Sequence, residues 1–349
     1  MGDNNYVTAN VNVVAIGPYE IKTNTINGVT FIGTGNFTVT GTQPVILKAI
    51  GTPIEQMPNI QYFIYSNSAL EQSSVCNFKI TYKYYDINIL VIGSSVYGPT
   101  KNTTYSLGRI LTAQSNFGPS GLVKVNSINI YTSGSVGTES ALRTLIDRNK
   151  IDMIFVVVGG RVYGSASEGL SKFVKNDKGI VVYSLENYER DFISFIGSVD
   201  PTAAGTSYET RYTMTNPISA NIPSDFSKSS FGELNGKRLG NDATNGSYFS
   251  NMGANMQGIA SRDNDVNWLW AGKHKEYGVF FIGDGGWMIG TTTNSSNVIY
   301  PTVSDIYGKP IPKYDYGNSA SKGDVYNSLL FVNIMEWSVK YLLGNKLNK

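Results

Sequence analysis

The apolar pattern of the chain changes near residue 86, and this change constrains the fold more than any other feature. After it, residues 87–94 and 152–160 form continuous apolar runs that end in turn residues, as expected for strands buried on both faces of a parallel sheet. Further strands are predicted at 125–131 and 179–184, and amphipathic helices at 106–115, 140–149 and 168–175. This alternation predicts a doubly wound, mostly parallel α/β sheet.

The remainder of the chain extends this α/β domain, which we expect to span residues 86–349. A buried strand is predicted at 277–284 and a closing helix at 325–343. Residues 200–275 are rich in Asn, Ser and Gly, a composition that predicts long loops with short strands.

Residues 1–85 show strand periodicity and no helix signals. Val7, Ala9, Val11 and Val13 alternate with polar residues, as a half-buried strand requires. Further short apolar runs lie at 30–32, 36–40, 45–49, 61–65 and 76–82. This spacing predicts an all-β domain, an antiparallel sandwich.

The composition favours a protein that works at a surface. Charged residues make up only 15% of the 349 residues, and Asn, Ser, Thr, Gly and 23 Tyr residues take their place. Such residues are typical of extracellular and virion surfaces. The net charge is +2 and no run of Lys and Arg reaches five, so nucleic-acid binding is not expected.

Cys76 is the single cysteine, so no intramolecular disulfide and no cysteine-based zinc site can form. Its neighbours predict a strand, in which a lone cysteine is interpreted as a small buried apolar residue. The chain opens without the basic start or apolar core of a signal peptide, so the sequence leaves open whether such a segment was removed. No apolar stretch reaches 18 residues, and no membrane span is expected.

Three sequence segments are similar to the Ig-like repeats of large secreted adhesins and surface proteins in the Bacteroidetes. They are residues 29–37, 40–43 and 47–53, and they are followed, as in those repeats, by a strand with a lone cysteine, here Cys76. The resemblance covers residues 1–85. It implies an Ig-like sandwich that serves as a spacer or binding module, with no active site.

Residues 86–343 resemble the class I glutamine amidotransferase-like proteins, particularly their ThuA-like branch. The matching phrases are the strand at 88–92, the strand and Gly-Gly turn at 152–160, Asn216-Pro217-Ile218, the Gly-Asp turn at 278–285 and the helix at 327–337. Catalytic members carry a Cys after the strand that matches 179–184, where this chain has Ser184-Leu185-Glu186, and a His where it has Asn216. Glutaminase chemistry is therefore not expected.

Other catalytic chemistries have less specific support. Ser94 and Ser184 end predicted strands, but neither lies in a G-x-S-x-G elbow. The single histidine, His274, lies between two lysines and is interpreted as a solvated surface residue. Glu186 and Asp284 are the candidate acid/base pair, since glycoside hydrolysis needs two carboxylates about 5–9.5 Å apart. The alternative is that the carboxylates here cap helices or pair with arginine.

Ligands bind parallel α/β sheets at the carboxyl ends of the strands. On this basis the candidate ligand-binding residues are Ser94, Tyr97, Gly160, Arg161, Glu186, Asn187, Asp284 and Trp287. No cofactor or metal is expected, although residues 263–265 resemble the start of a calcium loop without its later Gly and Glu. Aromatic residues between 248 and 316 are interpreted either as core or as a contact surface.

These observations predict a non-enzymatic surface or assembly protein, extracellular or on the cell surface, that binds a glycan or protein partner. Two alternatives remain: a carbohydrate-active hydrolase that uses Glu186 and Asp284, and a structural component of a phage virion or contractile injection apparatus. A homo-oligomer or larger assembly is compatible with each.

Overall fold

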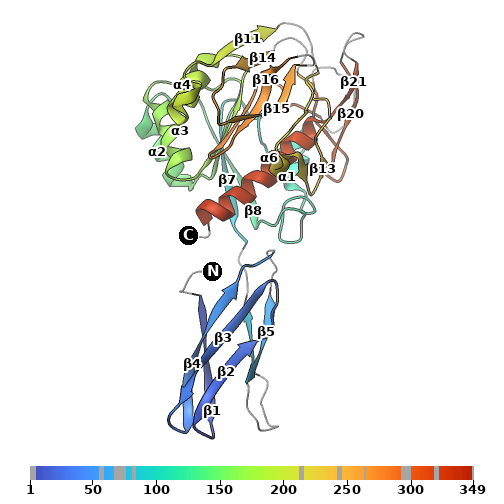
Figure 1. Ribbon diagram of the computed structural model, residues 1–349. Coiled ribbons are helices and arrows are strands. Elements are labelled where there is room, and N and C mark those ends of the chain that lie inside the picture. Colours follow the sequence, from blue (N-terminus) through green and yellow to red (C-terminus); the bar gives the residue numbers. More distant parts are fainter. Residues whose placement is uncertain are drawn as a thin grey trace. The chain divides into compact units, whose positions relative to one another are not determined.

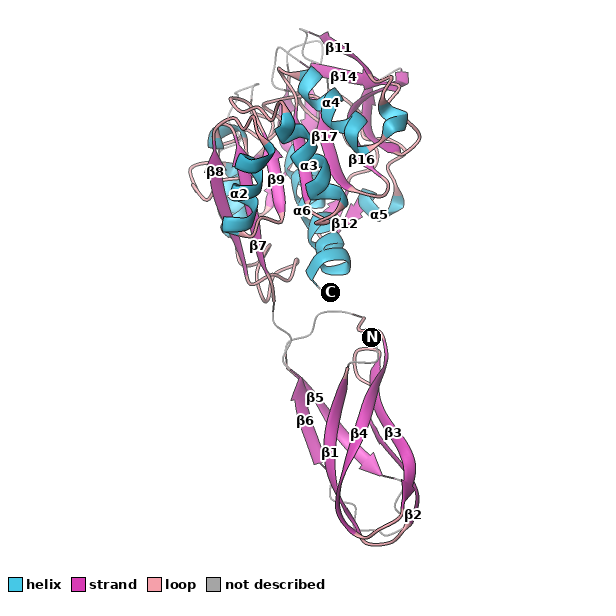
Figure 2. Cartoon of the chain, turned by 90° about the vertical axis from the view of Figure 1, so that its left-hand side faces the viewer, coloured by secondary structure: helices cyan, strands magenta, loops and turns pink. Residues whose placement is uncertain are grey.

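The computed structural model describes residues 5–54, 59–66, 76–80, 84–211, 216–241, 246–262, 265–291, 300–317 and 322–347. The chain divides into two compact units, Met1–Tyr84 and Tyr85–Lys349. Figures 1 and 2 show an all-β first unit and a second unit in which helices lie against a sheet. The protein is thus a mixed α/β protein with an N-terminal antiparallel sheet, as the sequence predicted.

The first unit is a six-stranded antiparallel sheet with the order β1-β4-β3-β2-β5-β6. Its strands are β1 (Tyr6–Val13), β2 (Gly17–Thr23), β3 (Val29–Phe37), β4 (Gly41–Gly51), β5 (Ile60–Ser66) and β6 (Cys76–Ile80). The rings of Phe31, Tyr62 and Phe78 meet with centroids 5.2–5.3 Å apart. Since β3 and β6 are not neighbours in the sheet, this contact requires the sheet to curl around one core.

Two details of this unit differ from the sequence prediction. The runs at 30–32 and 36–40 are not separate strands, because the first lies wholly within β3 and the second contributes only its first two residues, Asn36 and Phe37, to that strand. Gly33 keeps β3 continuous, since a Cβ there would lie 2.5 Å from the Ile46 carbonyl oxygen of β4. Cys76 is exposed rather than buried. It begins β6 opposite Ile64, and the half-buried side chains of that strand are Phe78 and Ile80.

The second unit is built on a nine-stranded mixed sheet with the order β11-β14-β16-β17-β10-β9-β7-β8, in which β15 also pairs with β16. Strands β8, β7, β9, β10 and β17 are parallel, and the others join antiparallel. The parallel strands are β7 (Asp86–Ile92), β8 (Ser127–Ser133), β9 (Met153–Val156), β10 (Ile180–Ser184) and β17 (Gly278–Ile282). The antiparallel strands are β11 (Ser207–Arg211), β14 (Gly246–Ser250), β15 (Met256–Arg262) and β16 (Asp265–His274).

Helices cover both faces of this sheet (Figures 1 and 2). They are α1 (Ser106–Thr112), α2 (Glu139–Asn149), α3 (Ser165–Lys175), α4 (Glu189–Val199), α5 (Ser224–Ser227) and α6 (Asn327–Leu342). Along β7, Ile89 and Val91 face the core cluster that contains α1 and α6, whereas Leu90 and Ile92 face the cluster of α2, α3 and α4. Burial of successive residues on opposite faces explains the continuous apolar runs.

Short elements complete the unit. They are the 3-10 turns η1 (Ser95–Tyr97) and η2 (Pro201–Ala203), the π-helical turn η3 (Leu343–Leu347), and the strand pairs β12 (Lys228–Ser229) with β13 (Gly232–Glu233), β18 (Val303–Ser304) with β19 (Pro310–Ile311), and β20 (Lys313–Tyr316) with β21 (Gly323–Val325). Within the described residues, no helix combines the length and the apolar character that a membrane crossing requires.

The prediction of long loops with short strands over residues 200–275 was wrong in the extent of the strands. Four strands from this region join the main sheet, and β16 spans ten residues. The glycines that suggested loops instead permit close strand packing. A Cβ on Gly272 in β16 would lie 2.5 Å from the Phe281 ring of β17 and 3.0 Å from the Gln257 carbonyl oxygen of β15.

Candidate functional site

A small pocket lies at the carboxyl ends of β9 and β10, the edge at which parallel sheets bind ligands. It is lined by Val156, Val157, Val158, Gly159, Gly160, Tyr183, Ser184, Glu186, Asn187 and Tyr188. Two chain segments thus form it: the loop that follows β9 and the turn that connects β10 to α4.

Glycine lets the loop after β9 press against the end of β7. A Cβ on Gly160 would meet the Ile92 carbonyl oxygen and would lie 2.5 Å from the Gly93 nitrogen. The Ser94 amide donates a hydrogen bond to the Val158 carbonyl (2.9 Å), which fixes the two loops to each other. One wall of the pocket is therefore closely packed backbone.

Glu186 supplies the carboxylate of the pocket. Its Oε2 is buried and has no hydrogen-bond partner among the described residues. A Cβ on Gly285 would meet that oxygen, so Glu186 packs against the turn after β17. Burial raises the pKa of Glu186, and the nearby Glu189 carboxylate raises it further. A buried acceptor of this kind can receive an N–H or O–H group from a ligand.

An aromatic and cationic cluster lies beside the pocket. The Arg161 guanidinium lies 4.2 Å from the ring centroid of Tyr188 and 5.1 Å from that of Tyr163. Asp191 in α4 holds it through two hydrogen bonds, of 2.9 and 3.2 Å. Tyr163 and Tyr188 are 44% and 48% exposed. The cluster therefore presents two aromatic rings held against Arg161, and Asp191 already balances the positive charge of that arginine.

Tyr188 has an unusual backbone. Its φ is 68°, the left-handed region that a bulky side chain rarely adopts, and it directly precedes α4. This conformation lets the chain turn from β10 into α4 while the ring stays exposed. Such strain persists where surrounding structure fixes it, and it is concentrated at functional sites.

The structure brings some of the predicted ligand residues together and separates others. Gly160, Glu186 and Asn187 line the pocket, and Arg161 lies beside it. Ser94 braces the pocket wall through its amide, and Tyr97 packs on the core cluster of α1 and α6.

Asp284 and Trp287 are fully buried and do not line the pocket. The Trp287 indole N–H donates to the Ser184 hydroxyl (2.9 Å), so this side chain supports the end of β10 from within the core. Glu186 and Asp284 therefore do not both open into this pocket.

Sequence reasoning missed the two exposed tyrosines of the site. It considered nine aromatic residues between 248 and 316, of which the structure buries five fully: Tyr248, Phe249, Trp270, Trp287 and Tyr316. Tyr163 and Tyr188 lie in the loops after β9 and β10, which were the loops expected to bind ligand. Their position at strand ends was the available signal.

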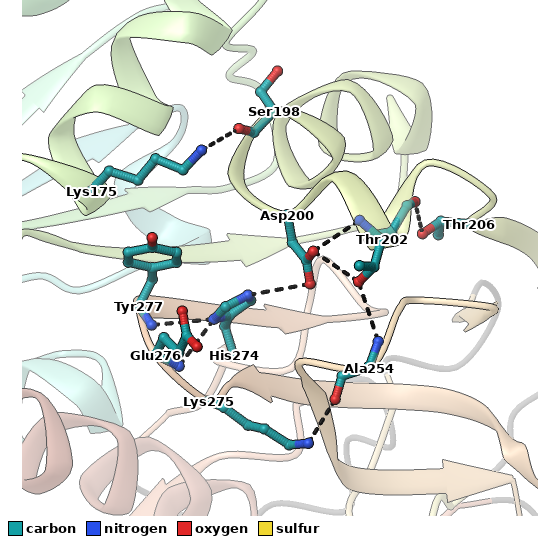
Figure 3. Close-up of polar contacts among 11 residues, drawn as sticks. Lys175, Ser198, Asp200, Thr202, Thr206, Ala254, His274, Lys275, Glu276 and Tyr277 are labelled. Carbon is teal, nitrogen blue, oxygen red and sulfur yellow. Dashed lines mark hydrogen bonds and ion pairs between the residues drawn. The ribbon is translucent and has the colours of Figure 1, made fainter.

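The interpretation of His274 as a surface residue was wrong, because only 1% of it is exposed. Figure 3 shows its ring between the turn after β16 and Asp200, at the end of α4. Its Nδ1 accepts the amide hydrogens of Glu276 (3.1 Å) and Tyr277 (3.2 Å). A neutral ring must then carry its proton on Nε2, which lies 3.6 Å from Asp200 Oδ2.

Asp200 is fixed in turn by Thr202, whose amide (2.9 Å) and hydroxyl (2.8 Å) donate to its Oδ1. Burial by itself would raise the pKa of Asp200, but these hydrogen bonds and the nearby His274 hold it below its ordinary value. The Asp200–His274 pair therefore joins η2 to the β16–β17 turn as a structural link.

His274 cannot act as a base for Ser184. In the sheet register Ser184 lies opposite Ile282, at the carboxyl end of β17, and Ala271 of β16 pairs with that same residue. His274 is three residues further along β16, about 10 Å toward the end of the sheet at which β10 and β17 begin. The pocket therefore has no histidine within reach.

Burial lowers the pKa of His274, while Asp200 and Glu276 act in the opposite direction and Lys273 lowers it slightly. In the unfolded chain His274 takes up a proton below pH about 6.5, before the folded protein does. Its contribution to stability is therefore complete above that pH and is lost as the pH falls. We expect urea unfolding followed by tryptophan fluorescence to show a loss between pH 7 and pH 5 that His274→Asn reduces. An equal loss in both proteins would contradict this assignment.

Within the described residues, no group of three or more His, Cys, Asp or Glu side chains could hold a metal ion. Asp263 and Asn264, from the calcium-like phrase, lie outside the described residues.

Neither a protein-family model nor a curated protein matches the chain. Among solved structures, a ThuA-like protein from Parabacteroides merdae ATCC 43184 is similar at 12% identity, with a TM-score of 0.32, covering 70% of this chain and 99% of that one. At this identity and TM-score, the likeness assigns the chain to no family.

Proposed function

We propose that the protein is a non-enzymatic surface or assembly protein whose α/β unit binds a carbohydrate at the pocket beside Tyr188. In this proposal the first unit is an Ig-like spacer and the second a ThuA-like unit that has lost its catalytic Cys and His. The protein would act outside the cell or on its surface. The observation that carries the proposal is that Glu186, Asn187 and the exposed Tyr188 line one pocket, while the exposed Tyr163 contacts the same Arg161 as Tyr188.

The chemistry of the pocket suits a neutral sugar better than an anion. Glu186 offers a buried acceptor for a hydroxyl group, and Asn187 offers both a donor and an acceptor. The exposed ring surface of Tyr163 and Tyr188 can pack against the apolar face of a sugar ring. The positive charge of Arg161 is already bound to Asp191, and a carboxylate in the pocket would repel a phosphate.

A hydrolase that uses Glu186 and Asp284 is less well supported, because Asp284 is buried and outside the pocket lining. The observation that keeps an acid/base role open is the raised pKa of Glu186. Its carboxylate neighbour is Glu189, which is 8% exposed and accepts a hydrogen bond from Ser247 (2.8 Å). Glu189 is therefore fixed as a structural group.

Binding can be measured on a glycan array and then by calorimetry with the best-binding glycan. Tyr188→Ala and Glu186→Gln are each expected to weaken binding about tenfold, through loss of ring contact or of a charge-assisted hydrogen bond. Tyr307→Ala is the matched control, since Tyr307 is 78% exposed but lies outside the pocket lining.

Four results would count against this proposal. If no glycan binds, or if Tyr307→Ala weakens binding equally, the pocket is not a carbohydrate site. If the wild-type protein cleaves the glycan and Glu186→Gln does not, the hydrolase is correct. If the native protein purifies within a particle or filament, the virion or injection-apparatus alternative is favoured.

A further inference from the structure

Strand β1 forms an open edge of the N-terminal sheet. It pairs with β4 on one side, and among the described residues no strand pairs with its other side. All eight of its residues continue one unbroken register with β4, from Tyr6 opposite Lys48 to Val13 opposite Gly41. The free side therefore offers a straight row of backbone N–H and C=O groups to another strand.

β1 lacks the devices by which proteins usually protect such an edge. It contains no charged residue, no proline and no bulge. The other edge of this sheet, β6, is five residues long and carries Lys79, and the edge strand β11 of the second unit carries Glu209 and Arg211. β8 is also uncharged, but most of its side chains are half-buried.

We propose that β1 is a self-association strand, which pairs antiparallel with β1 of a second copy across a two-fold axis at Asn10. This inference does not depend on the proposed carbohydrate site. Residues opposite each other in an antiparallel pair point to the same face, so even-numbered residues must meet even-numbered ones to keep the core face inward. An axis at Asn10 satisfies that condition.

This register is self-complementary. It pairs Tyr6 with Val14, Val7 with Val13, Thr8 with Asn12, Ala9 with Val11, and Asn10 with its own copy. Val14 is the residue that follows β1, and extending the pairing by this one residue would place it opposite Tyr6; the two are 65% and 56% exposed, and an aromatic ring opposite a β-branched residue is a favourable cross-strand pair. An axis at Ala9 would instead place Tyr6 opposite Asn12. The exposed side chains of β1 are uncharged, so pairing two copies brings no like charges together. This favours a second copy of the chain as the partner of the β1 edge.

Cross-linking of the full-length chain tests both the association and its register. In a Cys76→Ser background, Asn10→Cys would place two thiols directly opposite each other, close enough for a disulfide after a small adjustment. Asn12→Cys is the matched control, because it lies on the same exposed face but about 13 Å from its own copy along the strands. We expect a disulfide-linked dimer from Asn10→Cys on non-reducing gels, and little from Asn12→Cys. Equal cross-linking of both variants, or none of either, would refute the register.

Light scattering over a range of concentrations gives a second readout. Asn10→Lys would place two positive charges together at the axis, and we expect it to raise the dissociation constant of the dimer by at least about tenfold. Thr42→Lys, on the neighbouring strand opposite Asn12, is the control that should leave the dimer intact. A wild-type protein that is monomeric throughout overturns the proposal, as does a dimer that Asn10→Lys leaves unchanged.

Discussion

Replacing His274 with alanine is expected to lower the free energy of unfolding of the α/β unit by about 3–4 kcal/mol. The substitution leaves a cavity where a fully buried ring packed. It also removes the nitrogen that accepts the Glu276 and Tyr277 amide hydrogens. The buried carboxylate of Asp200 in turn loses the imidazole that lies 3.6 Å from it. Each of these changes removes a stabilising interaction from the folded state alone.

Urea unfolding can be followed by tryptophan fluorescence, since all four tryptophans lie in the second unit. His274→Asn is the matched control, because its side-chain oxygen can accept from the same amides, and we expect it to lose less stability than alanine. A loss of less than about 1 kcal/mol in His274→Ala would mean that the ring is not a structural link.

Replacing Gly160 with alanine is expected to destabilise the same unit by about 3 kcal/mol and to deform the pocket. The added Cβ would meet the Ile92 carbonyl oxygen, and it would lie 2.5 Å from the Gly93 nitrogen. Both contacts are with backbone, so no side chain can rotate away, and the loop after β9 must shift from the end of β7.

Gly197→Ala provides the control for this effect. Gly197 lies within α4, and a Cβ there would meet nothing within 4 Å. Alanine in a helix interior is expected to stabilise the protein by up to about 1 kcal/mol. The two substitutions add the same methyl group, so opposite signs in urea unfolding would assign the loss to the contact at Gly160. Stability of Gly160→Ala equal to that of the wild-type protein would contradict the close packing of the two loops.

Much of the fold could be predicted from apolar periodicity. The runs around Leu90 and Ile154 correctly indicated strands buried on both faces, and the helices around Leu142 and Leu170 lie where the amphipathic pattern placed them. The antiparallel strands β14 to β16 were predicted only as short strands within long loops, because their Asn, Ser and Gly residues are also typical of loops. Only the packing of Gly272 against β15 and β17 reveals why glycine is placed there.

The candidate site could be predicted only in part. The rule that ligands bind at strand ends indicated Gly160, Glu186 and Asn187, which line one pocket. The same rule could not exclude Asp284, because sequence does not show whether a strand-end carboxylate points outward or into the core.

The sequence by itself determined the pattern of alternating buried strands and helices, the absence of a second cysteine and the uncharged character of β1, because these depend on residue type and spacing along the chain. Tertiary structure alone decided that Tyr188 is exposed beside Arg161 and that His274 is buried against Asp200. Those positions depend on contacts between residues distant in the sequence, and periodicity carries no information about such contacts.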